Sequence, residues 1–153
     1  MASKESYVIT KKNNQTEKEA INYILSENKG FYLPDLEQRK LILQSFNLDN
    51  KFSRAFDLIY VEDKTKLNWD KIDLNEVTLI ELKTTKKELT NNPHGFFFGA
   101  TQNEFDLAEK LGNRYKFCFV SLHNNSLSYK LLNYKELEGL IKNKRVQYQI
   151  NLK

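Results

Sequence analysis

The sequence predicts an α/β (α+β) fold in which a mixed central β-sheet is flanked by helices. Residues 77–85 (VTLIELKTT) form an apolar run typical of a buried strand, and residues 115–122 form a second such run. Helical patterns precede the first run and separate the two, an order typical of layered α/β domains. A chain of 153 residues suffices for one core, so we expect a single domain over residues 1–153 with a polar N-terminal segment at residues 1–15.

The first helix is expected to begin at Thr16. Residues 7–9 could form a short peripheral strand before it. Residues 16–19 (TEKE) have the arrangement of a capping box, with Glu19 able to reach back to the cap. Glu17 precedes Ile21 by four residues and so lies at the edge of the apolar stripe; alternatively it is an acid favoured by the helix dipole in the first turn.

The next elements carry the first candidate site residue. Residues 37–46 could form a second short helix, although the hydrophobic period is imperfect; its inward residues would be Leu36, Leu41, Leu43 and Phe46. Residues 52–61 are strand-like in composition, and Asp57 lies near the beginning of that strand. The alternation of strand side chains places Asp57 on the face shared with Ile59 and Val61. A long charged hairpin loop, residues 62–76, would connect this strand to the strand at 77–85.

The second half of the chain predicts a polar, basic loop followed by further strands and helices. A third strand is expected at residues 96–100. Residues 101–104 (TQNE) form another capping box, opening a helix through Leu111 that Gly112 closes. The strand at 115–122 would hold Cys118 in the core. Smaller elements are expected beyond it: a strand at 127–132, a helix at 134–142 and a last strand at 146–152.

Composition excludes several classes of protein. With 40% hydrophobic and 29% charged residues the chain is globular, and its formal charge of +4 allows a polyanionic partner without requiring one. We see no apolar stretch of about 20 residues and no apolar core of a secretory signal, so we expect a cytoplasmic protein with no membrane association. One cysteine and two histidines exclude an internal disulfide and a structural zinc site, so any metal would be bound by oxygen.

The strand at 77–85 carries a charge pair on one face. Because strand side chains alternate, Glu81 and Lys83 share one side while Ile80 and Leu82 point to the other. An edge strand with a solvated face would explain the pair without any chemistry. The same Glu-x-Lys pattern at 27–29 and 62–64 lies in polar surroundings, whereas the copy at Glu81 follows an earlier strand that also carries an acid.

Asp57 and Glu81 can therefore meet at one end of the sheet. Two carboxylates and a main-chain carbonyl, for which Leu82 is a candidate, are oxygen ligands suited to Mg²⁺, and Mn²⁺ could substitute. Lys83 would lie beside the water ligands. An ion and an ammonium group together can activate water and stabilise charge at a phosphate.

This pattern resembles the PD-(D/E)XK nuclease superfamily, which includes many restriction endonucleases. The resemblance covers residues 16–122 and rests on Asp57, on Glu81-Leu82-Lys83 in a strand, and on an acid in the preceding helix. The residue before Asp57 is Phe56 rather than proline. The resemblance implies a restriction endonuclease-like core and a Mg²⁺-dependent endodeoxyribonuclease in which Asp57 and Glu81 hold the metal and Lys83 helps to activate water. Glu17, or alternatively Glu19, would be the helix acid.

A weaker resemblance connects the chain to the C-terminal domain of the NO VEIN family. It rests on the same Glu-Leu-Lys strand, the Thr-x-x-Glu helix start at 101–104 and the aromatic strand at 115–117. It implies supporting roles at the active site for Gln102 and Glu104. Helix capping alone is the alternative explanation for both residues.

The function that we expect is DNA cleavage by a restriction-type endonuclease, or by its cleavage domain or subunit. One metal site cuts one strand, so cleavage of double-stranded DNA would need a homodimer or a partner subunit. Alternatively, each basic residue near the site is an ordinary solvated charge. The residues expected to contact DNA are Lys86, Lys87, Asn91, Asn92, His94 and Arg54, with Lys11 and Lys12 as further phosphate contacts.

Other functions remain open from the sequence. A structure-selective nuclease acting on repair intermediates or junctions is the nearest alternative. The chain could also be a noncatalytic nucleic-acid-binding module with the same fold, or a structural domain in which Glu81 and Lys83 form an ordinary surface pair. The recognition sequence, the oligomeric state and the role of residues 123–153 are not determined by these patterns.

Overall fold

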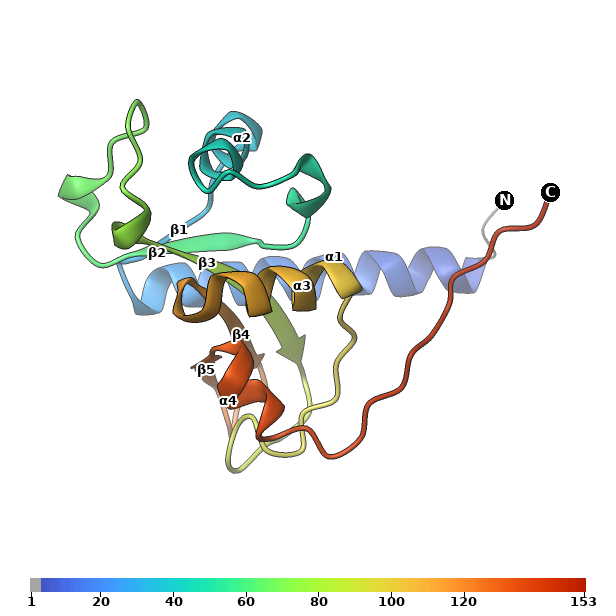
Figure 1. Cartoon of the computed structure of the whole chain (residues 1–153). Coiled ribbons are helices and arrows are strands. Elements are labelled where there is room, and N and C mark those ends of the chain that lie inside the picture. Colours follow the sequence, from blue (N-terminus) through green and yellow to red (C-terminus); the bar gives the residue numbers. More distant parts are fainter. Residues whose placement is uncertain (1–3) are drawn as a thin grey trace.

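A computed structural model describes the backbone of residues 4–153 and the side chains of residues 15–153 (Figure 1). One five-stranded sheet, in the order β1-β2-β3-β4-β5, organises the described chain. The β3–β4 pair is parallel and the other three pairs are antiparallel, so the predicted mixed sheet is confirmed. The strands are β1 (Phe31–Tyr32), β2 (Leu58–Val61), β3 (Val77–Thr85), β4 (Tyr115–Ser121) and β5 (Ser128–Leu132).

Helices cover both faces of this sheet. Helix α1 (Lys4–Glu27) packs Ala20 and Ile24 against the face that includes Ile80 and Leu82. Three helices contribute buried residues to the core on the opposite face (Figure 1): α2 (Leu36–Ser45), α3 (Gln102–Leu111) and α4 (Tyr134–Glu138). Short 3₁₀ turns lie at residues 50–52, 64–66, 74–76 and 112–114.

The central strand β3 has the bounds and the alternation that the sequence predicts. Ile80 and Leu82 belong to the core beneath α1, whereas Leu79 belongs to the core beneath the other helices. Glu81 and Lys83 therefore share the face of Leu79, beneath α3. Since β3 and β4 are parallel, the chain must cross over between them, and α3 is part of that crossover.

Helix α3 confirms the second predicted capping box. The Thr101 side chain accepts a bond from the Glu104 N–H, and the Glu104 side chain accepts one from the Thr101 N–H. Gly112 closes the helix in a positive-φ conformation that favours glycine. The strands at 115–122 and 127–132 are also confirmed to within one residue, and Cys118 is fully buried as expected.

Near the N-terminus, the first helix starts earlier than the sequence predicts. Residues 7–9 lie within α1 and form no strand, and Thr16 is an interior helical residue rather than a cap. No glycine or proline lies between residues 4 and 15 to end a helix that extends in that direction. The local capping pattern at 16–19 is therefore not a helix start.

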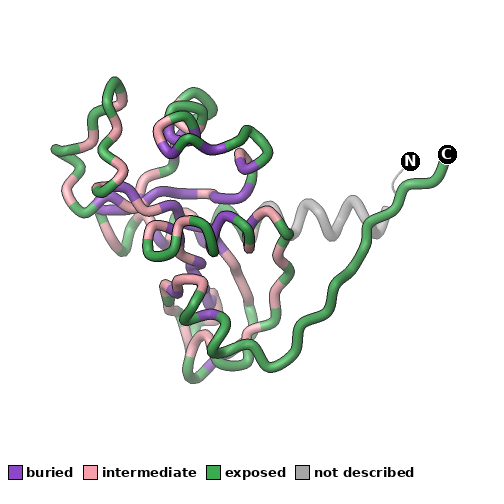
Figure 2. The backbone as a smooth tube through the Cα atoms, viewed as in Figure 1, coloured by how far each residue is buried: buried purple, intermediate pink, exposed green. Residues whose placement is uncertain are grey.

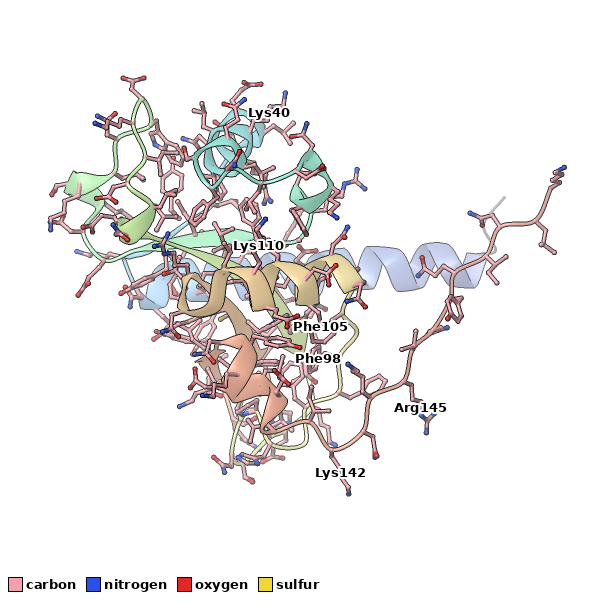
Figure 3. All side chains as sticks on the ribbon, viewed as in Figure 1. Lys40, Phe98, Phe105, Lys110, Lys142 and Arg145 are labelled. Carbon is pink, nitrogen blue, oxygen red and sulfur yellow. The ribbon has the colours of Figure 1, made fainter. Side chains whose placement is uncertain are left out.

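Three other expectations along the chain are wrong. Residues 96–100 form no strand, because Phe96 and Phe98 pack onto the face of the sheet at Phe119 instead of pairing with its edge. Residues 146–152 form no strand and are exposed throughout (Figure 2). Just before this segment, Lys142 and Arg145 point away from the helices and strands (Figure 3). Helix α4 ends at Glu138 rather than 142.

The predicted burial of α2 is partly corrected. Leu36 and Leu41 are exposed, while Ile42 and Leu43 are buried with Phe46. Asp35 caps the start of this helix. The face of the helix that packs on the core is formed by residues 42, 43 and 46. The strand expected at 52–61 is limited to β2, and Phe52 lies in a 3₁₀ turn before it.

No helix in the described part of the chain is both long enough and apolar enough to cross a membrane.

Candidate active site

Asp57 forms hydrogen bonds with the two residues of β3 that lie on either side of Glu81. The Asp57 N–H donates to the carbonyl of Ile80 at 2.8 Å, and its carboxylate oxygen Oδ2 accepts a hydrogen bond from the Leu82 N–H at 2.8 Å. The antiparallel register that pairs Leu58 with Ile80 brings these groups together. The predicted meeting of the two carboxylates is therefore found in the structure.

Glu81 is a buried acid with one unsatisfied oxygen. Its side chain is almost fully enclosed, and the oxygen Oε2 has no hydrogen-bond partner. Desolvation and the adjacent Asp57 carboxylate raise the pKa of Glu81 to about 10, although Lys83 opposes this shift. Desolvation also raises the pKa of Asp57, although the hydrogen bond from the Leu82 N–H stabilises the carboxylate and acts to lower it. The two facing carboxylates need a proton or a cation to lie so close together.

Lys83 links two acids that come from different elements. Its ammonium nitrogen Nζ lies 3.3 Å from Oε1 of Glu81 and donates a shorter hydrogen bond to Oε1 of Glu104. The Lys83 side chain is only 10% exposed. The pair expected on β3 is thus part of a buried three-residue network, and the surface-pair explanation does not describe it.

Glu104 has two roles in the structure. Its oxygen Oε2 accepts hydrogen bonds from the Thr101 N–H at 3.1 Å and from the Thr101 hydroxyl at 2.7 Å, which completes the helix cap. Its other oxygen binds Lys83. Burial opposes ionisation of Glu104, but the bonds from Lys83 and Thr101 outweigh it and hold the pKa of this carboxyl below 4.5. Capping and support of the lysine are therefore both present.

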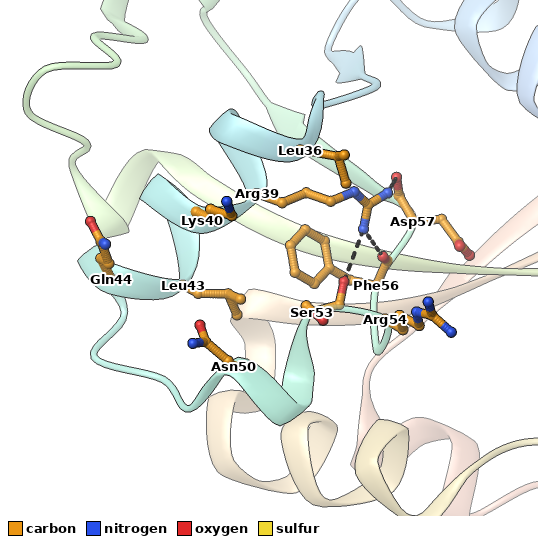
Figure 4. Close-up of a pocket in the computed structure, with 10 residues that line it drawn as sticks. All are labelled: Leu36, Arg39, Lys40, Leu43, Gln44, Asn50, Ser53, Arg54, Phe56 and Asp57. Carbon is orange, nitrogen blue, oxygen red and sulfur yellow. Dashed lines mark hydrogen bonds between the residues drawn. The ribbon is translucent and has the colours of Figure 1, made fainter.

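Arg39 holds the backbone that leads into β2, and the sequence analysis missed it. Its guanidinium donates to the carbonyls of Ser53 (3.2 Å), Phe56 (2.5 Å) and Asp57 (2.8 Å), and lies over the Phe56 ring (Figure 4). A planar guanidinium presents two separate nitrogens to different carbonyls, whereas a lysine has only one nitrogen from which to donate. No spacing in the sequence connects an arginine of α2 with a loop fourteen or more residues later.

Tyr115 is a second supporting residue that the sequence analysis did not identify. Its hydroxyl, from the first residue of β4, donates to the carbonyl of Ala55 at 2.5 Å. Desolvation, followed by the charges of Glu81 and Glu104, raises the pKa of Tyr115, so the phenol stays protonated and acts as a donor. Arg39 and Tyr115 together hold the segment that ends at Asp57.

Of the two candidate helix acids, Glu17 is the one near Asp57. Desolvation by the surrounding protein, followed by the charge of Asp57, raises the pKa of Glu17, while Arg39 and Lys83 oppose the shift. Glu19 instead pairs with Lys86 across 3.9 Å at the surface. Of the choices that the sequence left open, Glu17, Glu19 or neither, the charge of Asp57 acts on Glu17, and a role of Glu17 at the site stays a prediction.

The other residues predicted to serve catalysis or DNA binding differ in their exposure and in their hydrogen-bond partners. Gln102 is exposed at the start of α3, where its amide donates to Asp106 at 2.8 Å, away from the carboxylate pair. The Asn92 amide nitrogen donates to the carbonyl of Phe119 and to Ser128, so this side chain is turned into the protein rather than toward DNA. Exposed side chains that remain available to DNA are those of Lys86, Lys87, Asn91, His94 and Arg54.

A pocket of about 590 Å³, with apolar residues of α2 and basic side chains in its lining, adjoins Asp57 (Figure 4). Arg39, Lys40 and Arg54 bring positive charge to its lining, and Asp57 is the acid among the lining residues. The polar residues Gln44, Asn50 and Ser53 add hydrogen-bonding groups to it. This lining favours an anionic ligand that extends from the carboxylate pair along α2.

The donor atoms of the site fit a hard cation. The carboxyl groups of Asp57 and Glu81 are neighbours, and a cation could take the place of the proton that they share when no metal is bound. Mg²⁺ is commonly bound by one or two carboxylates with water completing its shell. Among the residues whose side chains are described, no group of three or more Asp, Glu, His or Cys side chains is placed to hold a metal ion. A cation at this point would thus depend on Asp57, Glu81 and main-chain or water oxygens.

Comparison with known proteins adds no family assignment, since no protein-family model, no curated protein and no solved structure matches this chain.

Proposed function

We propose that this chain is a metal-dependent DNA endonuclease of the PD-(D/E)XK type. One observation carries the proposal: the side chains of Asp57 and Glu81 meet beside β3, and Lys83 is bonded to the second of them. Two buried carboxylates this close to each other are stable only when they share a proton or bind a cation.

The residues of the site have distinct roles in this proposal. Asp57 and Glu81 would hold Mg²⁺, for which Mn²⁺ could substitute, with the Leu82 carbonyl as the third predicted ligand. When bound, the ion supplies Lewis-acid chemistry and favours deprotonation of a neighbouring water. Lys83 offers its ammonium protons to the anionic phosphate as negative charge develops there. Glu104 holds Lys83 in position.

The reaction is hydrolysis of a phosphodiester. A water oxygen forms a bond to phosphorus while the bond from phosphorus to one sugar oxygen breaks. The products are a phosphate monoester and a hydroxyl end, and the water supplies the proton of the leaving oxygen. Lys83 stabilises the additional charge on the phosphoryl oxygens during this exchange.

Double-stranded DNA is the proposed substrate. The basic pocket beside Asp57 and the exposed Arg54 support this choice, because cationic groups along the path of a backbone bind phosphates. Exposed Lys87 and His94 lie in the segment that follows β3. A restriction-type enzyme, or the cleavage subunit of one, would cut both strands only as a homodimer or with a partner subunit.

The test is cleavage of supercoiled plasmid and of mixed phage DNA at low salt, with Mg²⁺ or Mn²⁺ and with an EDTA control. Asp57→Asn keeps an acceptor for the Leu82 N–H but removes the charge, and it should abolish nicking. Asp70→Asn, at an exposed acid, is the matched control and should cleave as the wild type does. Cleavage that is unchanged by Asp57→Asn, or that persists in EDTA, would contradict the proposal.

A noncatalytic nucleic-acid-binding module is the second candidate. The observation that favours it is that Lys83 already has two protein partners, Glu81 and the ionised Glu104, as in a closed structural network. This function predicts salt-sensitive DNA binding in the same assay with no metal-dependent cleavage of any DNA.

A further inference from the structure

Phe97 is the most exposed large hydrophobic side chain in the described part of the molecule. It is 94% exposed, while Phe96 and Phe98 on either side of it are partly buried. A single exposed hydrophobic residue is common on protein surfaces and needs no explanation by itself. Phe97 differs from an ordinary exposed residue because both of its chain neighbours are packed on the sheet.

The two neighbours of Phe97 are anchored to the same residue of the sheet. The rings of Phe96 and Phe98 each lie 5.0 Å from the ring of Phe119, in edge-to-face contacts, and 6.1 Å from each other. Figure 3 shows Phe98 on the α3 side of the sheet. The amide of Asn92 also donates to the carbonyl of Phe119 at 3.0 Å. Phe97 is therefore presented to solvent from a segment held at several points.

The anchor lies directly beside the proposed catalytic lysine. In the parallel register of β3 and β4, Phe119 is the partner of Lys83. Paired residues on adjacent strands point to the same face about 5 Å apart. The anchored aromatic segment thus packs on the residue of β4 that neighbours Lys83, and Phe97 is the residue of this segment that is left exposed to solvent.

We propose that Phe97 stacks on a base of the nucleic acid bound at the Lys83 site. This inference rests on the proposed function and adds the class of substrate: DNA with an unpaired or extruded base close to the cleaved phosphodiester. An aromatic face stacks on any base that leaves its pair, and rigid presentation lowers the entropy lost on binding. The basic residues along the pocket at Asp57 would hold the backbone of the same strand.

The experiment measures binding in EDTA, so that it does not depend on cleavage. Fluorescence anisotropy of labelled oligonucleotides compares a fully paired duplex with the same duplex carrying a single-nucleotide bulge. Phe97→Ala should weaken binding to the bulged DNA by about 5- to 150-fold, the range for loss of one base stack, and affect the paired duplex much less. Leu127→Ala, at another exposed hydrophobic residue, is the matched control and should change neither affinity.

Two further variants test whether the aromatic face itself matters. Phe97→Leu keeps an apolar side chain and should lose affinity for the bulged DNA as Phe97→Ala does. Phe97→Trp in a Trp69→Phe background should retain binding, and its fluorescence should be quenched by the bulged DNA. Because the ring is exposed, all of these variants should unfold at the temperature of their parent proteins.

Each contrary outcome has a definite meaning. Equal binding of bulged DNA by the wild type and Phe97→Ala, with Asp57-dependent cleavage intact, would overturn this inference alone. Absence of both DNA binding and cleavage in the wild type would overturn it together with the proposed function. A concentration-dependent change in self-association on Phe97→Ala, with DNA binding unchanged, would make the ring part of a protein interface instead.

Discussion

Lys83 donates a hydrogen bond to Glu104, and this pair joins the central strand β3 to helix α3 at the candidate active site. Lys83 also contacts Glu81 on its own strand, so its position depends on one local and one distant carboxylate. The same Glu104 caps the helix through Thr101. A residue that starts a helix thereby orients the lysine beside the proposed metal ligands.

Glu104→Gln should slow cleavage while leaving the fold intact. Glutamine can still complete a capping box, but it no longer offers a charge to Lys83. Loss of such a supporting partner typically costs about 10- to 100-fold in activity. Steady-state kinetics should show a fall in kcat with KM changed little. Glu109→Gln, at an exposed acid on the same helix, is the control, and equal rates for the two variants would contradict the positioning role of Glu104.

Lys83→Ala should destabilise the protein as well as inactivate it. Removing the ammonium leaves the buried, ionised carboxylate of Glu104 without its cation, which costs about 3 kcal/mol when a buried pair is broken. Urea unfolding followed by circular dichroism measures the change. Adding Glu104→Gln to Lys83→Ala should restore part of the lost stability. Strictly additive effects would show that the two side chains do not interact.

The metal-free protein should lose stability as pH rises, because of Glu81. Folding raises the pKa of this carboxyl from 4.5 to about 10, so between these values the folded state binds a proton that the unfolded state has released. The stability that this proton contributes is fully present below about pH 4.5 and is lost as pH rises toward 10.

Thermal unfolding in EDTA across this pH range measures the effect. Glu81→Gln, which cannot ionise, should flatten the profile. Mn²⁺ should raise the Tm of the wild type at alkaline pH but not that of Glu81→Gln. A wild-type profile that matches the Glu81→Gln profile would contradict the buried, protonated state of this residue.

Arg39→Lys should disturb the segment that leads to Asp57. Arg39 binds the carbonyls of Ser53, Phe56 and Asp57 through two separate nitrogens, which the single nitrogen of lysine cannot replace, and loss of bonds from a charged donor costs about 2 kcal/mol. Cleavage should fall too, because the Asp57 backbone loses its support. Lys40→Ala, which removes only an exposed pair with Glu37, should cost less than about 1 kcal/mol. Comparable losses for both variants in urea unfolding would count against the role given to Arg39.

Cys118 should react with thiol reagents only after unfolding. The residue is fully buried in β4, and burial raises the pKa of its thiol to about 12, so the reactive thiolate is scarce near neutral pH. A chromogenic disulfide reagent should give one equivalent of colour in concentrated guanidinium chloride and almost none in native buffer. Rapid reaction of the native protein would indicate that β4 is not enclosed between the two helical layers.

The sequence by itself determined the elements whose signals are local. Strand β3 follows from an apolar run whose alternation also separates Glu81 and Lys83 from Ile80 and Leu82. Helix α3 follows from the capping box at Thr101, because its donors and acceptors lie within four residues. The expectation that any metal would be bound by oxygen came from the scarcity of cysteine and histidine.

Tertiary structure decided everything that joins distant segments. The β2–β3 register places Asp57 where it bonds the backbone of Ile80 and Leu82, the residues on either side of Glu81. The crossover that contains α3 brings Glu104 to Lys83. The support from Arg39 and Tyr115 could not be read from spacing, because both bind backbone carbonyls, which every residue possesses. The phenylalanines at 96 and 98 have strand-like composition, yet they pack on the face of the sheet at Phe119. A strand-like composition shows that a segment is suited to burial. Only the assembled sheet determines whether that segment pairs as a strand or packs on a face.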